Sequence, residues 1–186
     1  LPADAQSRLR EPLTRSVGLA EAFLRASRAE MLDAARFEDL DFAGLLHQAV
    51  DDAFVEARAR SVSLARTLPD EPVWIRGDFD LLHRALLNLV LNAVRHAPAG
   101  SAVEVSLETG AGRAVAAVVD HGPGIAADIL PRLFQRFARG IGTVGGTGLG
   151  LYFVQTVAQK HGGAVTVDSV PNRATRFVLD LPLAAR

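Results

Sequence analysis

Two pairs of neighbouring strand-like segments constrain the fold of this chain more than any other feature. The segments "AVEVSLET" (102–109) and "RAVAAVVD" (113–120) are joined by a turn that contains glycine. The segments "AVTVDSV" (164–170) and "RFVLDLPL" (176–183) form a second pair around "PNRAT". Strands that follow each other so closely are typical of hairpins. The sequence therefore predicts a mainly antiparallel sheet.

Helical patterns stand before and between these strands. Asp41 and Asp78 are suited to cap helices over 42–61 and 79–97, and a third helix is expected over 148–160. The chain has no regular alternation of strand and helix and no internal repeat. We therefore expect an α+β fold: a two-layer α/β sandwich with a mixed, mainly antiparallel sheet and helices on one face, preceded by an N-terminal amphipathic helix. Two further short strands are expected at 62–68 and 73–77.

The composition excludes several classes of protein. Of the 186 residues, 49% are hydrophobic and 22% are charged, as in ordinary globular domains, and the net charge of −1 gives no basic field for nucleic acid. The absence of cysteine excludes a disulfide framework and a thiolate metal site. No apolar run is long enough to span a bilayer. We expect a cytoplasmic domain that contacts neither nucleic acid nor, in this segment, a membrane.

The first helical pattern, over residues 9–32, carries an apolar seam with a period of 3.5 residues. One interpretation is a helix that lies on its own domain, and the other is a helix that pairs with a second helix, in another subunit. Ser27 interrupts the seam, so the spacing alone favours the first interpretation. The seam consists of Leu13, Val17, Ala20, Leu24 and Met31.

Asn88 and Asn92 are unusual residues for a helix interior. They stand four apart in "LLNLVLNAVRHA", so both project from one face of an otherwise apolar helix. Asn is a poor helix former because its amide competes with the backbone for hydrogen bonds, so this pair needs partners. The partners are either nearby backbone groups or Mg²⁺, which takes one or two protein oxygens together with phosphate oxygens. Arg95 and His96, one turn later, are placed to reach the same phosphates.

An acidic residue ends the strand 113–120. A buried Asp120 is costly unless its carboxylate accepts hydrogen bonds, and the adenine N6 amine is one suitable donor. Gly122 and Gly124 would let the backbone come close to a flat ring. The alternative is an Asx-type turn between strand and loop.

Four glycines surround Thr147 in "GGTGLGL" (145–151), at the expected start of the third helix. Free N–H groups and the helix dipole make a helix N-terminus an anion site, and Thr147 is suited to cap the helix or to contact a phosphate. The Walker A pattern GxxxxGK[ST] is absent. The stretch therefore predicts a phosphate site of another design, with a merely mobile loop as the alternative.

The order of "NLVLNAVRHA", "DHGPGI", "LFQRFARG" and "GGTGLGL" resembles the catalytic ATP-binding domain of bacterial sensor histidine kinases, in the superfamily of DNA gyrase B, Hsp90 and MutL. The N-terminal helix resembles the second helix of the dimerisation and histidine phosphotransfer domain, which favours the helix-pairing interpretation. The resemblance implies two parts: residues 1–36 as the C-terminal part of that helix, and residues 37–186 as the catalytic ATP-binding domain.

The resemblance also implies roles for single residues, with ATP and Mg²⁺ as cofactors. Asn92 would be the principal Mg²⁺ ligand, and Asn88 a catalytic residue and a second contact to metal or phosphate. Arg139, in a lid over 134–146, would neutralise the γ-phosphate during transfer. The other implied nucleotide contacts are Arg95, His96, Asp120, Gly122, Gly124, Ile125, Thr147, Gly148, Leu149, Gly150 and Thr175.

Asn88 separates the branches of this superfamily. In the gyrase, Hsp90 and MutL branches a Glu stands here and activates water for hydrolysis. An Asn cannot accept a proton at neutral pH, which fits transfer to an imidazole instead of water. One position departs from the family: Ala174, in "PNRAT", stands where a glycine is expected and bears on the fit around Thr175.

The implied function is that of a protein-histidine kinase, which transfers the γ-phosphate of Mg-ATP to a histidine for relay to a response regulator receiver domain. None of the five histidines lies on the N-terminal helix. We therefore expect the phosphoacceptor domain upstream in a longer protein and no autophosphorylation by this segment alone. The resemblance further implies that the longer protein is membrane-anchored and that it forms a homodimer through the N-terminal helix. The alternatives are a serine kinase of the anti-sigma-factor type and a nucleotide-sensing or interaction module without catalysis.

Overall fold

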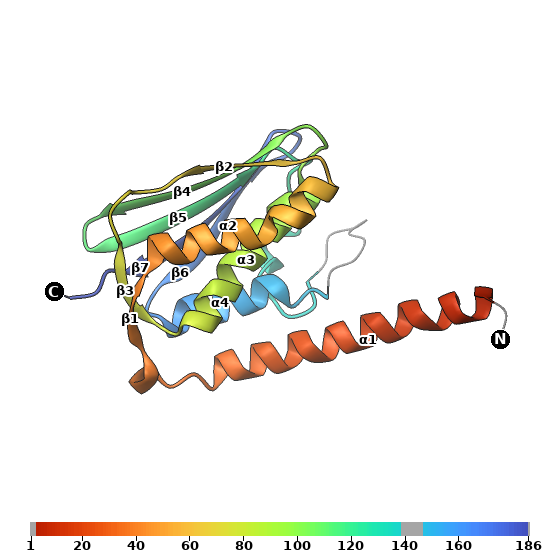
Figure 1. The fold of residues 1–186 in the computed structure, drawn as a ribbon, viewed down its shortest axis with the longest axis horizontal. Helices are drawn as coiled ribbons and strands as arrows, with labels where there is room; N and C mark the ends of the chain where they lie inside the picture. Colours follow the sequence, from red (N-terminus) through yellow and green to blue (C-terminus); the bar gives the residue numbers. More distant parts are fainter. Residues whose placement is uncertain (1–2, 139–146, 186) are drawn as a thin grey trace.

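The structure, a computed structural model, describes residues 3–138 and 147–185 and consists of a long helix followed by an α+β sandwich (Figure 1). Helix α1 (Ala3–Glu30) lies along the helical side of the sandwich and extends past it. A short 3-10 helix, η1 (Ala34–Arg36), leads into the sandwich, and the side chain of Asp33 caps it. The expected fold class is confirmed.

The main sheet has five strands in the order β2-β4-β5-β7-β6. Both predicted hairpins are present, and antiparallel pairing of β5 with β7 joins them at the centre of the sheet. The strand β2 pairs parallel with β4, so the sheet is mixed. In chain order the strands are β2 (Ser63–Thr67), β4 (Ala102–Gly110), β5 (Arg113–Asp120), β6 (Ala164–Val170) and β7 (Ala174–Pro182).

Three helices cover one face of this sheet (Figure 1). They are α2 (Phe42–Ala59), α3 (Phe79–His96) and α4 (Gly150–Lys160). The side chains of Asp41 and Asp78 accept hydrogen bonds from the first turns of α2 and α3, at 3.1 and 3.0 Å, so both predicted caps are present. The core between the layers includes Phe42, Leu46, Leu86, Val90, Phe177 and Leu179.

Two local features differ from the prediction. A small second sheet pairs β1 (Glu38–Asp41) with β3 (Trp74–Gly77), and the sequence "EDLD" of β1 gives no strand signal of its own. Helix α4 begins at Gly150 and not at residue 148, because Gly148 has a φ of +70°, outside the right-handed helical region.

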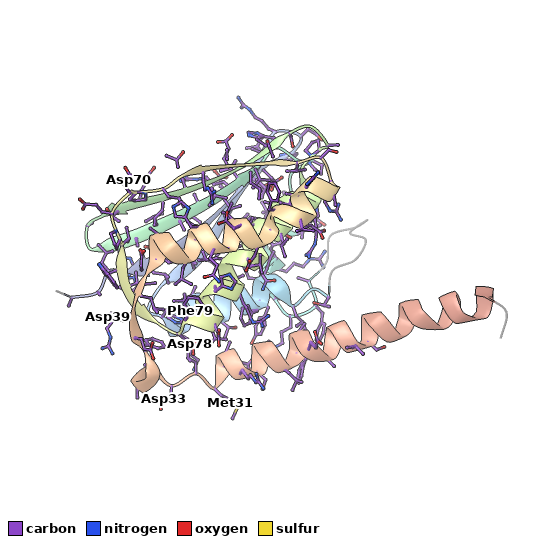
Figure 2. All side chains as sticks on the ribbon, in the orientation of Figure 1. Met31, Asp33, Asp39, Asp70, Asp78 and Phe79 are labelled. Carbon is purple, nitrogen blue, oxygen red and sulfur yellow. The ribbon has the colours of Figure 1, made fainter. Side chains whose placement is uncertain are left out.

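Three large residues of the apolar seam, at the described positions from 17 onward, are exposed. The side chains of Val17, Leu24 and Met31 are 57%, 60% and 83% exposed, and Met31 points away from the sandwich in Figure 2. Ala26 and Ala29 are buried instead, where α1 meets α4. Helix α1 thus contacts its own domain near its C-terminal end, but not through Val17, Leu24 or Met31. Within the described residues, no helix is both long and apolar enough to cross a membrane.

Candidate functional site

A buried carboxylate stands at the end of the central strand β5. Asp120 is only 2% exposed, and its Oδ1 accepts a hydrogen bond from the N–H of Gly122 at 2.9 Å. Burial raises the pKa of Asp120, while the N–H of Gly122 and the nearby His96 and His121 oppose this rise. The Asx-type turn is thus present, and it fixes the orientation of the carboxylate.

Two glycines after Asp120 stand where a side chain would collide with backbone. A Cβ on Gly122 would lie 2.4 Å from the carbonyl oxygen of His96 and 2.7 Å from Oδ1 of Asp120. Gly124 has a φ of +74°, and its Cβ would lie 2.8 Å from Cα of Pro171. The two glycines therefore let the backbone on both sides of Pro123 lie close to His96 and Pro171, whereas the sequence predicted a close approach to a flat ring.

A chain of hydroxyl groups lies beside the carboxylate. Thr175 is paired with Asp120 across β5 and β7, and its Oγ1 lies 3.0 Å from Oγ of Ser169. The same Ser169 oxygen accepts a hydrogen bond from the N–H of Ile125 at 2.9 Å. The structure thus brings the predicted residues Asp120, Ile125 and Thr175 together at one end of the sheet.

Ser169 was not among the predicted site residues. In β6 the inward positions are Val165, Val167 and then Ser169, so a polar residue replaces an apolar one in a strand that otherwise alternates. That break in the alternation is the signal that would have identified it.

Asn88, the first of the two asparagines of α3, lies near the start of α4. Both side chains are half-buried, and a Cβ on Gly150 would lie 3.9 Å from Oδ1 of Asn88. Among residues 3–138 and 147–185, no hydrogen bond is formed by the side-chain amide of Asn88 or of Asn92. The interpretation in which backbone groups satisfy these amides is therefore not supported, and both remain available to a ligand.

The start of α4 lacks a side-chain cap. Leu149 occupies the cap position and Thr147 does not, because the helix starts later than predicted. The N–H of Leu149 donates a long hydrogen bond of 3.4 Å to Oγ1 of Thr147. Among residues 3–138 and 147–185, no side chain caps the first turn of α4, and free N–H groups at a helix start are the kind of terminus that binds anions.

The remaining predicted residues differ in their surroundings. The carbonyl of His96 lies against Gly122, which places this residue at the Asp120 end of the site. Arg95 is exposed, and its Nε lies 3.9 Å from a carboxylate oxygen of Glu56 on α2. The side chain of Leu149 is buried beside α1, so only its backbone faces the glycine stretch. Arg139 lies outside the described residues.

A family model and curated relatives agree on one group of proteins. The model described as "Histidine kinase-, DNA gyrase B-, and HSP90-like ATPase" matches residues 77–185. The probable sensor histidine kinase TcrY of Mycobacterium tuberculosis is 38% identical over 185 residues, which cover 97% of this chain and 38% of TcrY. The sensor histidine kinase TrcS of the same species is 36% identical over 96% of this chain. The chain spans a little over a third of the length of these relatives.

Solved structures show the same relationship. Full-length ShkA in complex with AMPPNP aligns with a TM-score of 0.82 and 29% identity, over 100% of this chain and 40% of ShkA. The mycobacterial sensor histidine kinase MprB aligns with a TM-score of 0.70 and 31% identity, over 81% of this chain and 99% of that structure. The buried Asp120, the paired asparagines and the uncapped start of α4 thus lie in a chain that belongs to the histidine kinase-, DNA gyrase B- and HSP90-like ATPase family and carries the ATPase domain of sensor histidine kinases.

Proposed function

We propose that residues 37–186 are the catalytic domain of a sensor histidine kinase, and that residues 1–36 end its dimerisation and phosphotransfer helix. The domain binds ATP with Mg²⁺ and transfers the γ-phosphate to a histidine elsewhere in a longer, membrane-anchored protein, on its cytoplasmic side. From that histidine the phosphate passes to the receiver domain of a response regulator. The observation that carries this proposal is the buried Asp120 carboxylate at the end of the central strand β5, which the N–H of Gly122 orients.

The residues around Asp120 fit an adenine ring. A carboxylate that is nearly inaccessible to water gains most from a donor that the ligand brings, such as the N6 amine. The hydroxyl groups of Ser169 and Thr175 offer further polar contacts, and Gly122 and Gly124 let the turn after Asp120 lie close against His96 and Pro171. Ala174 precedes Thr175 in an ordinary strand position, so the missing glycine does not strain the backbone there.

The residues around α3 and α4 fit the phosphates and Mg²⁺. Within residues 3–138 and 147–185, no three His, Cys, Asp or Glu side chains are placed to hold a metal ion. The ion would therefore be held by the amide oxygens of Asn88 and Asn92 together with phosphate oxygens, a donor set that Mg²⁺ prefers. Bound there, Mg²⁺ would neutralise charge on the phosphates, whose other contacts are the backbone N–H groups at the start of α4.

The identity of Asn88 favours transfer of the γ-phosphate to a histidine over transfer to water. Asn88 holds the phosphate end but cannot remove a proton from water, so hydrolysis is slow and an imidazole from the phosphotransfer domain is the better nucleophile. We propose that Arg139 meets the γ-phosphate during transfer. The exposed seam of α1 fits a homodimer, in which helices from two copies pair.

The nucleotide site is tested by titrating ATP in the presence of Mg²⁺ into the wild type, Asp120→Asn and Asp168→Asn. Asp168 is exposed on β6, so its substitution is a matched control for charge. We expect about 10- to 100-fold weaker binding for Asp120→Asn, because a hydrogen bond to a charged group is lost, and wild-type binding for Asp168→Asn. Equal binding by all three proteins contradicts the assignment.

The transfer step is tested with a longer protein that includes the phosphotransfer domain. Incubation with ATP and Mg²⁺ should give phosphate that is labile in acid and stable in base, the behaviour of phosphohistidine. Phosphate that is stable in acid would instead indicate a serine kinase, and the absence of any protein-bound phosphate would indicate a nucleotide-sensing module.

A further inference from the structure

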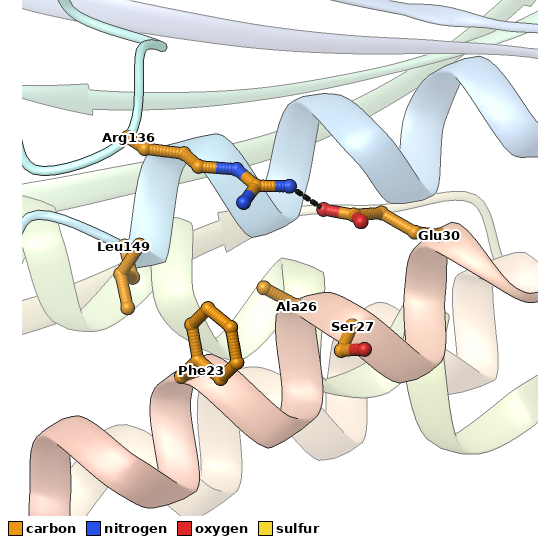
Figure 3. Close-up of a pocket in the computed structure, with 6 residues that line it drawn as sticks. All are labelled: Phe23, Ala26, Ser27, Glu30, Arg136 and Leu149. Carbon is orange, nitrogen blue, oxygen red and sulfur yellow. Dashed lines mark hydrogen bonds and ion pairs between the residues drawn. The ribbon is translucent and has the colours of Figure 1, made fainter.

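Three polar side chains from separate segments meet between α1 and α4. Glu30 belongs to the last turn of α1, Tyr152 to the first turn of α4, and Arg136 to residues 134–138, the described part of the expected lid (Figure 3 shows Glu30 and Arg136). The Tyr152 hydroxyl donates a hydrogen bond of 2.7 Å to the Glu30 carboxylate, and Nη2 of Arg136 donates to both Glu30 and the Tyr152 oxygen. The guanidinium of Arg136 also lies 4.8 Å from the centre of the Tyr152 ring. We call these three residues the Glu30 cluster.

The contacts within the Glu30 cluster favour the charged forms of Glu30 and Arg136. The hydrogen bond from Tyr152 and the charge of Arg136 lower the pKa of Glu30. The Arg136 pKa is raised by Tyr152 and Glu30. Both side chains remain partly exposed, so a competing anion can reach the guanidinium.

The segment that carries Arg136 is also attached to the proposed phosphate site. The N–H of the next residue, Phe137, donates a hydrogen bond of 2.9 Å to the carbonyl of Gly148. The two backbones are so close that a Cβ on Gly148 would lie 2.8 Å from Phe137. Leu149, in the middle of the glycine stretch, lines a pocket against α1 together with Arg136, Phe23 and Ala26 (Figure 3). One short segment therefore contacts both α1 and the residues proposed to bind phosphate.

We propose that Arg136 is a cation shared between Glu30 and the phosphates of a bound nucleotide, so that docking of α1 and binding of nucleotide weaken each other. The inference rests on the proposed function, because it places phosphates at the start of α4. A single guanidinium cannot pair fully with two anions, and the Glu30 carboxylate repels the phosphates at the same time. Because coupling between two binding events is reciprocal, nucleotide loosens α1 by as much as α1 weakens the nucleotide.

The test measures ATP affinity in the presence of Mg²⁺ for Glu30→Gln, Tyr152→Phe, Arg136→Ala and Glu108→Gln. We expect about three- to fivefold tighter binding for Glu30→Gln, the range for a partly exposed ion pair, and a smaller gain for Tyr152→Phe. Arg136→Ala should bind more weakly than the wild type, although it breaks the same ion pair. Glu108 is exposed on β4 and has no ion pair among the described contacts, so Glu108→Gln is the control for net charge.

Amide hydrogen exchange supplies the reciprocal measurement. Saturating ATP should speed exchange in residues 23–30 of the wild type, and these residues should exchange fast in Glu30→Gln with or without ATP. The inference is overturned if Glu30→Gln binds ATP no more tightly than Glu108→Gln, or if Glu30→Gln and Arg136→Ala shift the affinity in the same direction. If the wild type itself binds no ATP, the proposed function fails and the inference fails with it.

Discussion

The imidazole of His161 stacks on the ring of Phe37, with ring centroids 4.5 Å apart and an angle of 5° between the planes. His161 ends α4, and Phe37 follows η1 in the connection from α1. Nε2 of His161 accepts a hydrogen bond from the N–H of Asp78 at 3.0 Å, and Nδ1 lies 2.7 Å from the carbonyl of Val157. These contacts require a neutral imidazole with its proton on Nδ1.

Acid should destabilise the protein through His161. Burial lowers the pKa of this residue, so below the unfolded pKa of about 6.5 the unfolded chain binds a proton that the folded chain resists. The stabilisation is complete above that pH and is lost as the pH falls through the folded pKa. Denaturant titrations give the unfolding free energy near neutral pH and about one unit below 6.5. The decrease between the two pH values should be smaller in His161→Gln than in the wild type. His47 is exposed, so His47→Gln should show the same decrease in unfolding free energy as the wild type. The prediction is contradicted if His161→Gln also shows the decrease of the wild type.

A single methyl group at Gly122 should damage both stability and binding. The added Cβ meets the carbonyl of His96 and the carboxylate of Asp120, so the turn must shift, at a cost of about 1–3 kcal/mol of unfolding free energy. Thermal unfolding and ATP titration of Gly122→Ala measure the two effects. Gly110→Ala is the control, because a Cβ there meets no atom within 4 Å. Equal melting temperatures for the two variants would show that the turn tolerates a side chain.

The substitution Asp120→Asn should weaken nucleotide binding without weakening the fold. Because burial raises the pKa of Asp120, its stabilising contribution is present only in acid and is lost as the pH rises through the folded pKa. At neutral pH the charged carboxylate therefore opposes folding, and the neutral amide removes that cost. The unfolding free energy of Asp120→Asn at neutral pH should equal or exceed that of the wild type. A clear loss of stability would mean that the carboxylate is held mainly for structure.

Substitution of Asn92 should act on the metal-dependent part of the affinity. We expect Asn92→Ala to bind Mg-ATP about tenfold more weakly, which corresponds to about 1.4 kcal/mol, and to bind ATP without Mg²⁺ as the wild type does. Neither Asn88 nor Asn92 has a hydrogen-bond partner in the described chain, so alanine should leave the unfolding free energy unchanged or higher. Equal losses of affinity with and without Mg²⁺ would place Asn92 on the nucleotide itself.

The exposed seam of α1 should control self-association. Polar substitutions at Val17 and Leu24 remove apolar surface from one side of α1, and both residues are more than half exposed. Sedimentation of Val17→Gln/Leu24→Gln should show a monomer at concentrations where the wild type is a dimer. The double variant Phe54→Gln/Val55→Gln, on the exposed side of α2, should behave as the wild type does. A monomeric wild type would contradict the proposed pairing.

Much of the fold could be predicted from the sequence because the elements carry strong local signals. The caps Asp41 and Asp78 and the alternation in β4 to β7 gave boundaries within about two residues, the usual range for such signals. The strand β1 could not be predicted, because only its pairing with β3 makes "EDLD" a strand. The start of α4 was predicted at residue 148 and lies at Gly150, because the sequence does not indicate which glycine of the run has a left-handed backbone.

The site was predictable to the extent that its residues break a local rule. Asn88, Asn92 and Asp120 are polar residues in apolar elements, and each was identified for that reason. Glu30, Arg136 and Tyr152 break no rule where they stand, since each is an ordinary residue for the surface of its segment. Their meeting depends on how α1 lies across α4, which no local pattern encodes.

Helix α4 is held from the N-terminal part of the chain both at its start and at its end. Tyr152 is bound to Glu30 of α1, and His161 is stacked on Phe37 of the connection that follows α1. The two residues are nine positions apart, or about 14 Å along a helix. With only one such contact, α4 could rotate about it. Contacts at both ends fix the orientation of the helix. If α1 shifts or rotates, then either α4 moves with it as a rigid body, or the Tyr152–Glu30 or the His161–Phe37 contact breaks. The choice between those outcomes decides whether a movement of α1 also moves the start of α4, where we propose that phosphate binds.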